Sequence, residues 1–148
     1  MKPEKASEKF VQTLLLVFPG WHSKLVRPFK EMLHKEMSLE TYYCLETLKA
    51  CGQITMSELA EQLKVPKQQV TKLVDNLSKY GFVERLFKEG DRRAIWIALT
   101  PRAISYLDEY YLKNTEFIRT LEEQLTEAEL LELNHAVEVL GKILPKLK

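Results

Sequence analysis

The chain has 148 residues, an ordinary apolar fraction of 45% and a formal net charge of +1. This length suits one domain, or one compact lobe plus helices that need a partner. Because the total charge is nearly balanced, it gives no indication of whether the protein binds nucleic acid. The charge is unevenly distributed, because residues 64–93 hold eight Lys or Arg against four Asp or Glu, and residues 94–148 hold six against nine. A basic segment beside an acidic one is typical of a DNA-facing surface and a separate assembly surface, although random clustering of solvated charges explains the counts equally well.

An apolar stripe at helical spacing predicts a helix at the start of the chain, with the members Phe10, Leu14 and Phe18. Pro19-Gly20 should end or kink that helix, and Pro28 should distort a second helical stretch over residues 21–35. The stripe is too apolar for a free surface, so a partner chain is its natural cover.

The cysteines and the lack of export signals predict a cytoplasmic protein. Cys44 and Cys51 lie in one predicted helix, and their separation of ~10 Å along its axis is too large for a disulfide between them. Reduced, buried and inert thiols are therefore expected. The apolar run 11–18 is short and no cleavage site follows it, and no run reaches the ~18 apolar residues of a membrane span.

A helix-turn-helix is predicted in the middle of the chain. Residues 38–51 should form a helix that Gly52 ends, and Gln53-Ile54 is an extended link that can become a third strand. Residues 55–58 have the capping-box pattern S/T-x-x-E at the start of the next helix. Val65-Pro66 then makes a turn, with Pro66 suited to the first position of another helix.

The helix after this turn has one apolar and one polar face. Its apolar positions follow the i, i+3, i+4, i+7 rule, and they are Val70, Leu73, Val74 and Leu77. The opposite face is polar, with Gln68, Lys72, Asp75 and Lys79 flanked by Gln69, Thr71 and Asn76. Glutamine amides can pair with adenine, lysine with guanine or phosphate, and threonine with a thymine methyl. The helix is thus a candidate reader of a major groove, although taken alone a solvated polar face is the simpler interpretation.

A hairpin with a basic tip follows the candidate reader helix. Residues 82–87 and 94–99 are predicted strands, joined by residues 88–93 with a Gly-Asp turn pattern. The negative potential of a minor groove would attract Arg92 and Arg93, and Asp91 can orient Arg93 through a charge-assisted hydrogen bond. Two helices, a turn and a basic hairpin together match the plan of a winged helix-turn-helix, which binds DNA.

The last third of the chain predicts two long helices with coiled-coil seams. Thr100-Pro101 starts the first helix, whose seam has one polar member and consists of Ile104, Leu107, Tyr111, Asn114, Ile118, Leu121 and Leu125. A second capping box, residues 126–129, precedes a similar series formed by Leu130, Leu133, Val137, Leu140, Leu144 and Leu147. Seams of this length predict a helical dimer interface, and a monomeric helical hairpin packed on itself is the alternative.

The order of these motifs resembles the MarR family of bacterial winged-helix transcription regulators. The resemblance covers residues 38–106 and is carried by V-T-K-L-V-D-N-L, F-V-E-R and D-R-R-A followed by L-T. It implies a mainly α (α+β) fold with a winged helix-turn-helix lobe at 38–100, a two- to three-stranded sheet, and dimerisation helices at 1–37 and 101–148. It also implies a homodimer on a near-palindromic operator of double-stranded DNA. The family usually has a capping serine where Pro66 stands here.

The resemblance assigns site residues to two surfaces. The expected DNA-binding residues are Lys67, Gln68, Gln69, Thr71, Lys72, Lys79, Arg85, Lys88, Arg92 and Arg93. Within this set, Arg93 matches the family's minor-groove arginine and Asp91 its orienting acid. The expected dimer interface consists of Phe10, Leu14, Phe18, Tyr111, Ile118, Leu121, Leu133, Val137, Leu140 and Leu144.

MarR-like proteins often hold a small aromatic or phenolic ligand between the dimer helices and the DNA-binding lobe. Candidates to line such a crevice are Trp21, His22, Tyr42 and Tyr43, with core or dimer aromatics as the alternative. The sequence has no clustered metal ligands, no phosphate-binding loop and no catalytic motif. We therefore expect a homodimeric DNA-binding repressor released by a small ligand, with no catalytic residues, cofactor, metal or membrane partner. The alternative is a winged-helix protein-interaction module without specific DNA binding.

Overall fold

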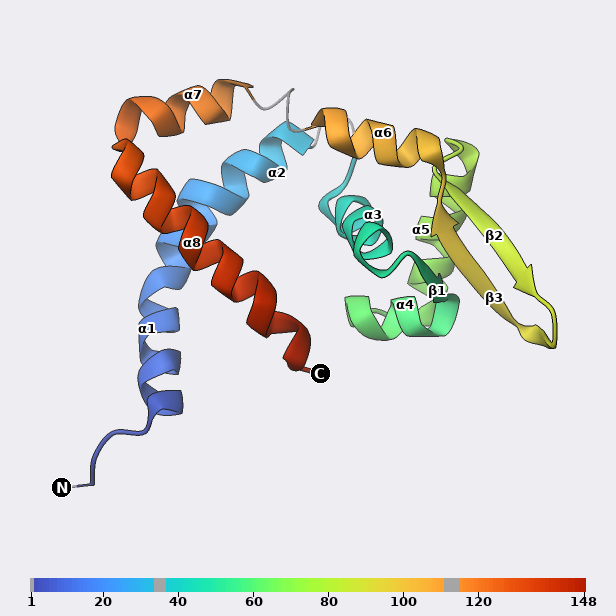
Figure 1. Cartoon of the computed structure of the whole chain (residues 1–148), viewed down its shortest axis with the longest axis horizontal. Helices are drawn as coiled ribbons and strands as arrows, with labels where there is room; N and C mark the ends of the chain where they lie inside the picture. Colours follow the sequence, from blue (N-terminus) through green and yellow to red (C-terminus); the bar gives the residue numbers. More distant parts are fainter. Residues whose placement is uncertain (1, 34–36, 111–114) are drawn as a thin grey trace. The chain divides into compact units, whose positions relative to one another are not determined.

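The computed structural model describes residues 2–33, 37–110 and 115–148, without the side chains of Asp91 and Arg92 (Figure 1). The chain forms two compact units, Met1–Tyr110 and Tyr111–Lys148. Among the helices in these described ranges, none combines the length and apolar character that crossing a membrane requires.

The N-terminal helix continues past the prolines that were expected to interrupt it. Helix α1 (Ala6–Trp21) contains Pro19, and it passes into a π-helical turn, η1 (His22–Val26), and then into α2 (Arg27–Leu33). Of the two outcomes predicted at Pro19-Gly20, an end or a kink, the end of the helix is therefore wrong. The distortion predicted for residues 21–35 is present as the π-turn. The wider π-turn shifts the hydrogen-bond register just before Pro28, whose ring and missing N–H would otherwise disturb a regular helix.

Three helices form the helical part of the lobe that follows, α3 (Leu39–Cys51), α4 (Met56–Leu63) and α5 (Lys67–Lys79). Their starts confirm the predicted caps, because Ser38 caps α3 and Thr55 with Glu58 forms a capping box on α4. One apolar core joins the helices and the sheet, and its fully buried members include Leu45, Leu48, Leu59, Val70, Val74 and Ile97.

A three-stranded antiparallel sheet in the order β1-β3-β2 completes the lobe, with β1 (Gln53–Thr55), β2 (Val83–Lys88) and β3 (Asp91–Leu99). The predicted third strand at Gln53-Ile54 is confirmed. Ile54 pairs with Ile97, and Val83 pairs with Leu99. Directly paired residues point to the same face of a sheet. Because Ile54, Ile97 and Val83 are all buried, this face packs on the core.

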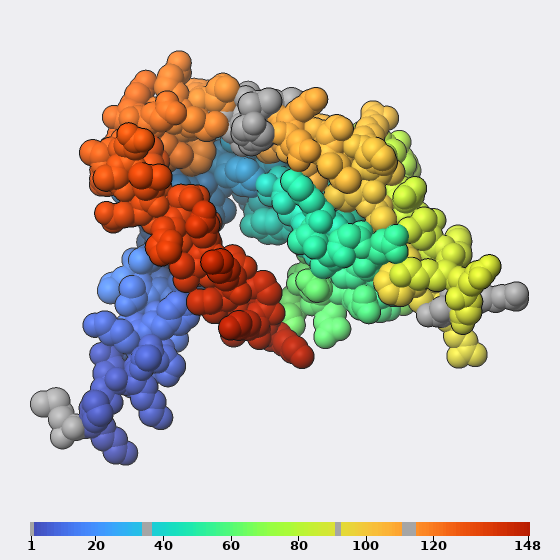
Figure 2. Space-filling view, viewed as in Figure 1, coloured from blue at the N-terminus to red at the C-terminus, as the bar shows by residue number. Residues whose placement is uncertain are grey.

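The β2–β3 hairpin is longer than predicted and extends past the helices of the lobe, as the ribbon and the space-filling view show (Figure 1, Figure 2). Strand β3 begins at Asp91 rather than Ala94, so only Glu89 and Gly90 connect the strands. Gly90 has a φ of +89°, a left-handed conformation that glycine adopts without strain. The segment around Arg93 is polar and lacks the apolar alternation that predicts a strand, so its sequence predicts a loop. It forms a strand because backbone pairing does not require that alternation.

Helix α6 (Pro101–Tyr110) returns to the lobe after β3. The predicted cap is present, because Thr100 Oγ1 accepts a hydrogen bond of 3.2 Å from the Ala103 N–H. Leu107, a member of the predicted seam, is buried in the core of the lobe, as is the neighbouring Tyr110, whereas Ile104 at the start of the seam is 43% exposed.

The second unit contains α7 (Thr115–Gln124), α8 (Glu127–Ile143) and a short 3-10 turn, η3 (Leu144–Lys146). The predicted capping box of Thr126 and Glu129 is confirmed at the start of α8. Two members of the predicted seam, Tyr111 and Asn114, lie outside the described residues. Large apolar side chains remain exposed on α8, including Leu133, Val137, Leu140 and Ile143.

Candidate nucleic-acid interface

Helix α5 presents a polar face because its apolar face is anchored in the core. Val70 and Val74 are fully buried, and Leu77 is nearly so. The other side of the helix is exposed at Gln68, Thr71, Lys72, Asp75, Asn76 and Lys79. Of the predicted reading residues on α5, only Gln69 is half-buried. A helix held in this way offers amide, hydroxyl and ammonium groups to a ligand that carries hydrogen-bonding edges and negative charge.

The start of α5 differs by one residue from the prediction. Pro66 is the N-cap, in an extended conformation, and Lys67 is the first helical residue. The Pro66 carbonyl accepts the N–H groups of Gln69 at 3.0 Å and Val70 at 3.2 Å, but no side chain caps this end. Helix N-termini carry a partial positive charge, and an end without a side-chain cap suits contact with a phosphate.

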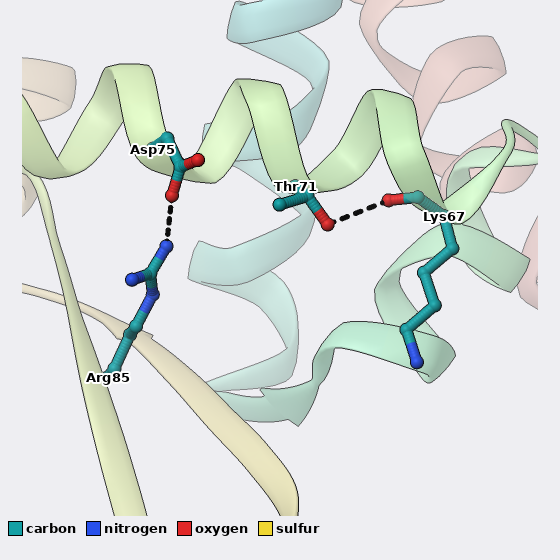
Figure 3. Close-up of polar contacts among 4 residues, drawn as sticks. All are labelled: Lys67, Thr71, Asp75 and Arg85. Carbon is teal, nitrogen blue, oxygen red and sulfur yellow. Dashed lines mark hydrogen bonds and ion pairs between the residues drawn. The ribbon is translucent and has the colours of Figure 1, made fainter.

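The hydroxyl of Thr71 is used within the helix. Its Oγ1 donates a hydrogen bond of 3.0 Å to the Lys67 carbonyl one turn earlier (Figure 3). The exposed Thr71 side chain therefore has its methyl group left for contact with a neighbouring apolar group, which agrees with the proposed thymine contact.

An ion pair joins α5 to the hairpin. Arg85 Nη2 of β2 donates a hydrogen bond to Asp75 Oδ1 of α5 (Figure 3). The two side chains are 40% and 52% exposed, respectively. The sequence predicts Arg85 as a DNA contact and indicates no role for Asp75. Their separation by ten residues in two different elements offered no local pattern that would predict the pairing.

The basic residues of the hairpin have different surroundings. Lys88 Nζ lies 3.5 Å from the centroid of the Trp96 ring, a cation–π contact that the sequence did not predict. The Arg93 side chain is exposed and belongs to β3. The predicted orientation of Arg93 by Asp91, like the role of Arg92, depends on side chains outside the described part of the chain.

The candidate effector residues fall into two places. Trp21 and His22 are exposed at the junction of α1 and η1, and Tyr43 is exposed on α3. Tyr42 is half-buried, with its ring centroid 5.1 Å from that of Phe29 and 5.9 Å from that of Tyr110. These contacts favour the alternative of a packed aromatic for Tyr42.

Burial controls the ionisation of two groups on α3. Desolvation, together with the nearby Glu46 carboxylate, raises the pKa of Tyr42 above its ordinary value. Burial alone raises the pKa of the Cys44 thiol to about 11. Cys51, by contrast, is exposed. Cys44 therefore fits the predicted inert thiol, whereas the prediction of a buried Cys51 is wrong.

Residues 37–95, which contain α3, α4, α5 and most of the hairpin, match the sequence model of the MarR family. The chain carries a MarR-family domain. The transcriptional regulator YsmB of Bacillus subtilis (strain 168) is 30% identical over 58% of this chain and 59% of its own length, so the chain spans less than two thirds of that relative. The transcriptional repressor MdtR of the same organism is 24% identical over 93% of this chain and 90% of its own.

Solved structures have the same fold. The YusO protein from Bacillus subtilis has a TM-score of 0.65 at 24% identity, over 93% of this chain and 99% of its own. A MarR variant from E. coli complexed with operator DNA has a TM-score of 0.60 at 21% identity, over 93% and 99%. NadR in complex with 4-hydroxyphenylacetate has a TM-score of 0.60 at 21% identity, over 97% and 99%.

The relatives that share this domain have names that state a role in transcription. YsmB, MdtR and the PapX protein of Escherichia coli are named as transcriptional regulators or repressors. The chain is accordingly similar to transcriptional regulators through its MarR-family domain at residues 37–95, and this similarity does not favour the alternative of an interaction module without specific DNA binding.

Proposed function

We propose that this MarR-family protein is a homodimeric repressor that binds a near-palindromic operator in the bacterial cytoplasm and leaves it when a small aromatic or phenolic ligand binds. Each α5 enters a major groove and each hairpin tip enters the neighbouring minor groove. The MarR–operator complex among the similar structures supports this reading. At its identity of 21% that likeness establishes only the fold, so the contacts must be argued from this chain.

The observation that carries the proposal is that α5 and the β2–β3 hairpin pack on one apolar core, so the polar face of α5 and the basic hairpin are held in the same lobe. Exposed lysines on α5 and on β2 supply positive charge to phosphates, namely Lys67, Lys72, Lys79 and Lys88. Gln68 and Gln69 are placed near the N-terminus of α5, the part of a reading helix that contacts base edges. The exposed Arg93 guanidinium suits the negative potential of a narrow minor groove.

Exposed apolar surface supports the homodimer. On α1, Phe10 is 55% exposed and Phe18 is 49% exposed. On α8, Val137 is 49% exposed and Leu140 is 37% exposed. Monomeric proteins rarely leave such series uncovered, and a second copy of this chain is the proposed cover for each. A two-fold dimer then places two α5 helices about one DNA turn (~34 Å) apart, as a palindromic operator requires.

The ligand is proposed from the aromatic groups near α3 and from a relative. NadR is bound to 4-hydroxyphenylacetate in its solved structure. In this chain the exposed Tyr43 of α3, with Trp21 and His22 at the junction of α1 and η1, supplies aromatic surface and polar groups suited to a phenolic acid, whereas Tyr42 packs against other aromatic rings. A ligand that binds the DNA-free conformation more tightly would shift the population away from the operator.

A binding-site selection from random DNA, followed by titration of the selected site, tests the DNA-binding mode. Arg93→Ala should weaken operator binding at least tenfold and lower the slope of log affinity against log salt by ~0.9. Arg119→Ala is the matched control, because Arg119 is an exposed arginine of α7. Wild-type affinity and salt slope in the Arg93→Ala protein would disprove the wing contact. Repeating the titration with phenolic acids tests release.

A further inference from the structure

The ion pair between Asp75 and Arg85 joins α5 to the hairpin, and neither direct base contact nor phosphate contact explains it. We infer that these two side chains are a positioning pair, which fixes the angle between α5 and the hairpin so that one DNA site can engage both. The inference rests on the proposed function, because it assigns a geometric role within that DNA-binding surface. It also removes Arg85 from the set of phosphate contacts.

The strand register shows where Arg85 points. Arg85 pairs with Ile97, which is fully buried, and it lies two residues after Val83, which is 6% exposed. Alternate residues of a strand share a face, so Arg85 belongs to the face of β2 that packs on the core. Its charged end passes beyond the apolar contacts and meets Asp75 of α5 (Figure 3).

Arg85 occupies the last place on that face before the hairpin leaves the lobe. Phe87, two residues further along, is 75% exposed, and the pairing of β2 with β3 becomes irregular between Leu86 and Lys88. The part of the hairpin beyond Leu86 therefore has little apolar packing to set its direction. A polar contact at Arg85 is well placed to fix the direction in which the tip leaves the lobe.

The charges of the pair support the same role. Asp75 lies on the exposed polar face of α5, where an unpaired carboxylate would repel DNA phosphates. Arg85 neutralises that carboxylate through a charge-assisted hydrogen bond. A guanidinium engaged in this way holds the helix and the strand together, and the pair as a whole adds no net charge to the DNA-binding surface.

The test removes the pair without changing the net charge. The double variant Asp75→Asn/Arg85→Gln should bind the selected operator about threefold more weakly, in keeping with the modest strength of exposed ion pairs, and its salt slope should equal that of the wild type. Lys49→Gln/Asp108→Asn is the matched control, because Lys49 and Asp108 form another exposed pair, 3.3 Å apart, between α3 and α6. The control should bind with wild-type affinity.

A double-mutant cycle separates positioning from a merely structural role. If the pair places the tip, the loss caused by Asp75→Asn/Arg85→Gln should disappear in an Arg93→Ala background, where no minor-groove contact remains to be misplaced. A pair that only stabilises the fold would give the same loss in both backgrounds. The charge-swapped variant Asp75→Arg/Arg85→Asp should recover part of the lost affinity.

Three results would overturn the inference while leaving the proposed function intact. The first is an unchanged operator affinity in the double variant, and the second is an equal loss of affinity in the Arg93→Ala background. The third is a salt slope lowered by ~0.9 in Arg85→Gln alone, which would make Arg85 a phosphate contact. If the wild-type protein selects no DNA sequence at all, the proposed function fails and the inference fails with it.

Discussion

Thr100 Oγ1 donates a hydrogen bond of 2.6 Å to the Gly81 carbonyl, and this contact ties the start of α6 to the turn that ends α5. The same oxygen accepts the Ala103 N–H, so one hydroxyl serves two elements. Gly81 has a φ of +72°, which suits the turn after a helix and is strained for other residues. The orientation of α5 relative to the helix leaving the lobe therefore depends on a small polar contact as well as on the core.

Thr100→Val should lower the free energy of unfolding by about 1–2 kcal/mol, because it removes a helix cap and leaves the Gly81 carbonyl without this donor. Urea denaturation measures the change. Thr120→Val is the control, since the Thr120 hydroxyl makes an exposed bond to the Glu116 carbonyl and caps no helix. Equal losses in the two variants would contradict the capping role.

Thr71 should contact DNA through its methyl group, because its hydroxyl bonds the Lys67 carbonyl. Thr71→Val keeps a methyl at that place and should retain the preference for thymine at one operator position. Thr71→Ser keeps the hydroxyl and should lose about 1 kcal/mol, the order of one buried methyl group. Titration of the selected operator and of a thymine-to-cytosine variant measures the preference. The opposite order of the two variants would show that the hydroxyl contacts the base.

The stability of the lobe should fall in alkaline solution. Burial raises the pKa of Cys44 from 9.0 to about 11. The thiol ionises near pH 9.0 in the unfolded chain but only near pH 11 in the folded chain, so high pH favours the unfolded chain. The stability that the protonated Cys44 contributes is therefore fully present below about pH 9 and is lost as the pH rises toward 11. The expected loss is about 3 kcal/mol, because each pKa unit between 9.0 and about 11 is worth ~1.4 kcal/mol. Comparing the slope of unfolding free energy against pH in Cys44→Ala and Cys51→Ala isolates the effect, which only Cys44→Ala should reduce.

The exposed apolar face of α8 should be needed for dimerisation. Val137→Glu places a charge on that face and should convert the dimer to monomer at micromolar concentration, as measured by sedimentation equilibrium. His135→Glu is the control, because two positions along a helix turn a side chain by ~200° to another face. A Val137→Glu protein that remains fully dimeric would place the interface elsewhere.

The local features of this protein were determined by its sequence. The capping boxes at Thr55 and Thr126 are patterns of four neighbouring residues, and both are present. The polar face of α5 follows from the 3.6-residue period of its apolar positions, and the buried Val70 and Val74 lie where that period predicts. Such features need only short-range backbone hydrogen bonds and the burial of one helix face.

The tertiary structure alone decided how distant side chains meet. Arg85 meets Asp75 because strand register and helix packing bring them together. Lys88 likewise meets Trp96 across the hairpin. The π-turn between α1 and α2, just before Pro28, is also a feature that no propensity predicts. Each of these contacts joins groups whose meeting depends on the three-dimensional path of the backbone, which local sequence patterns do not specify.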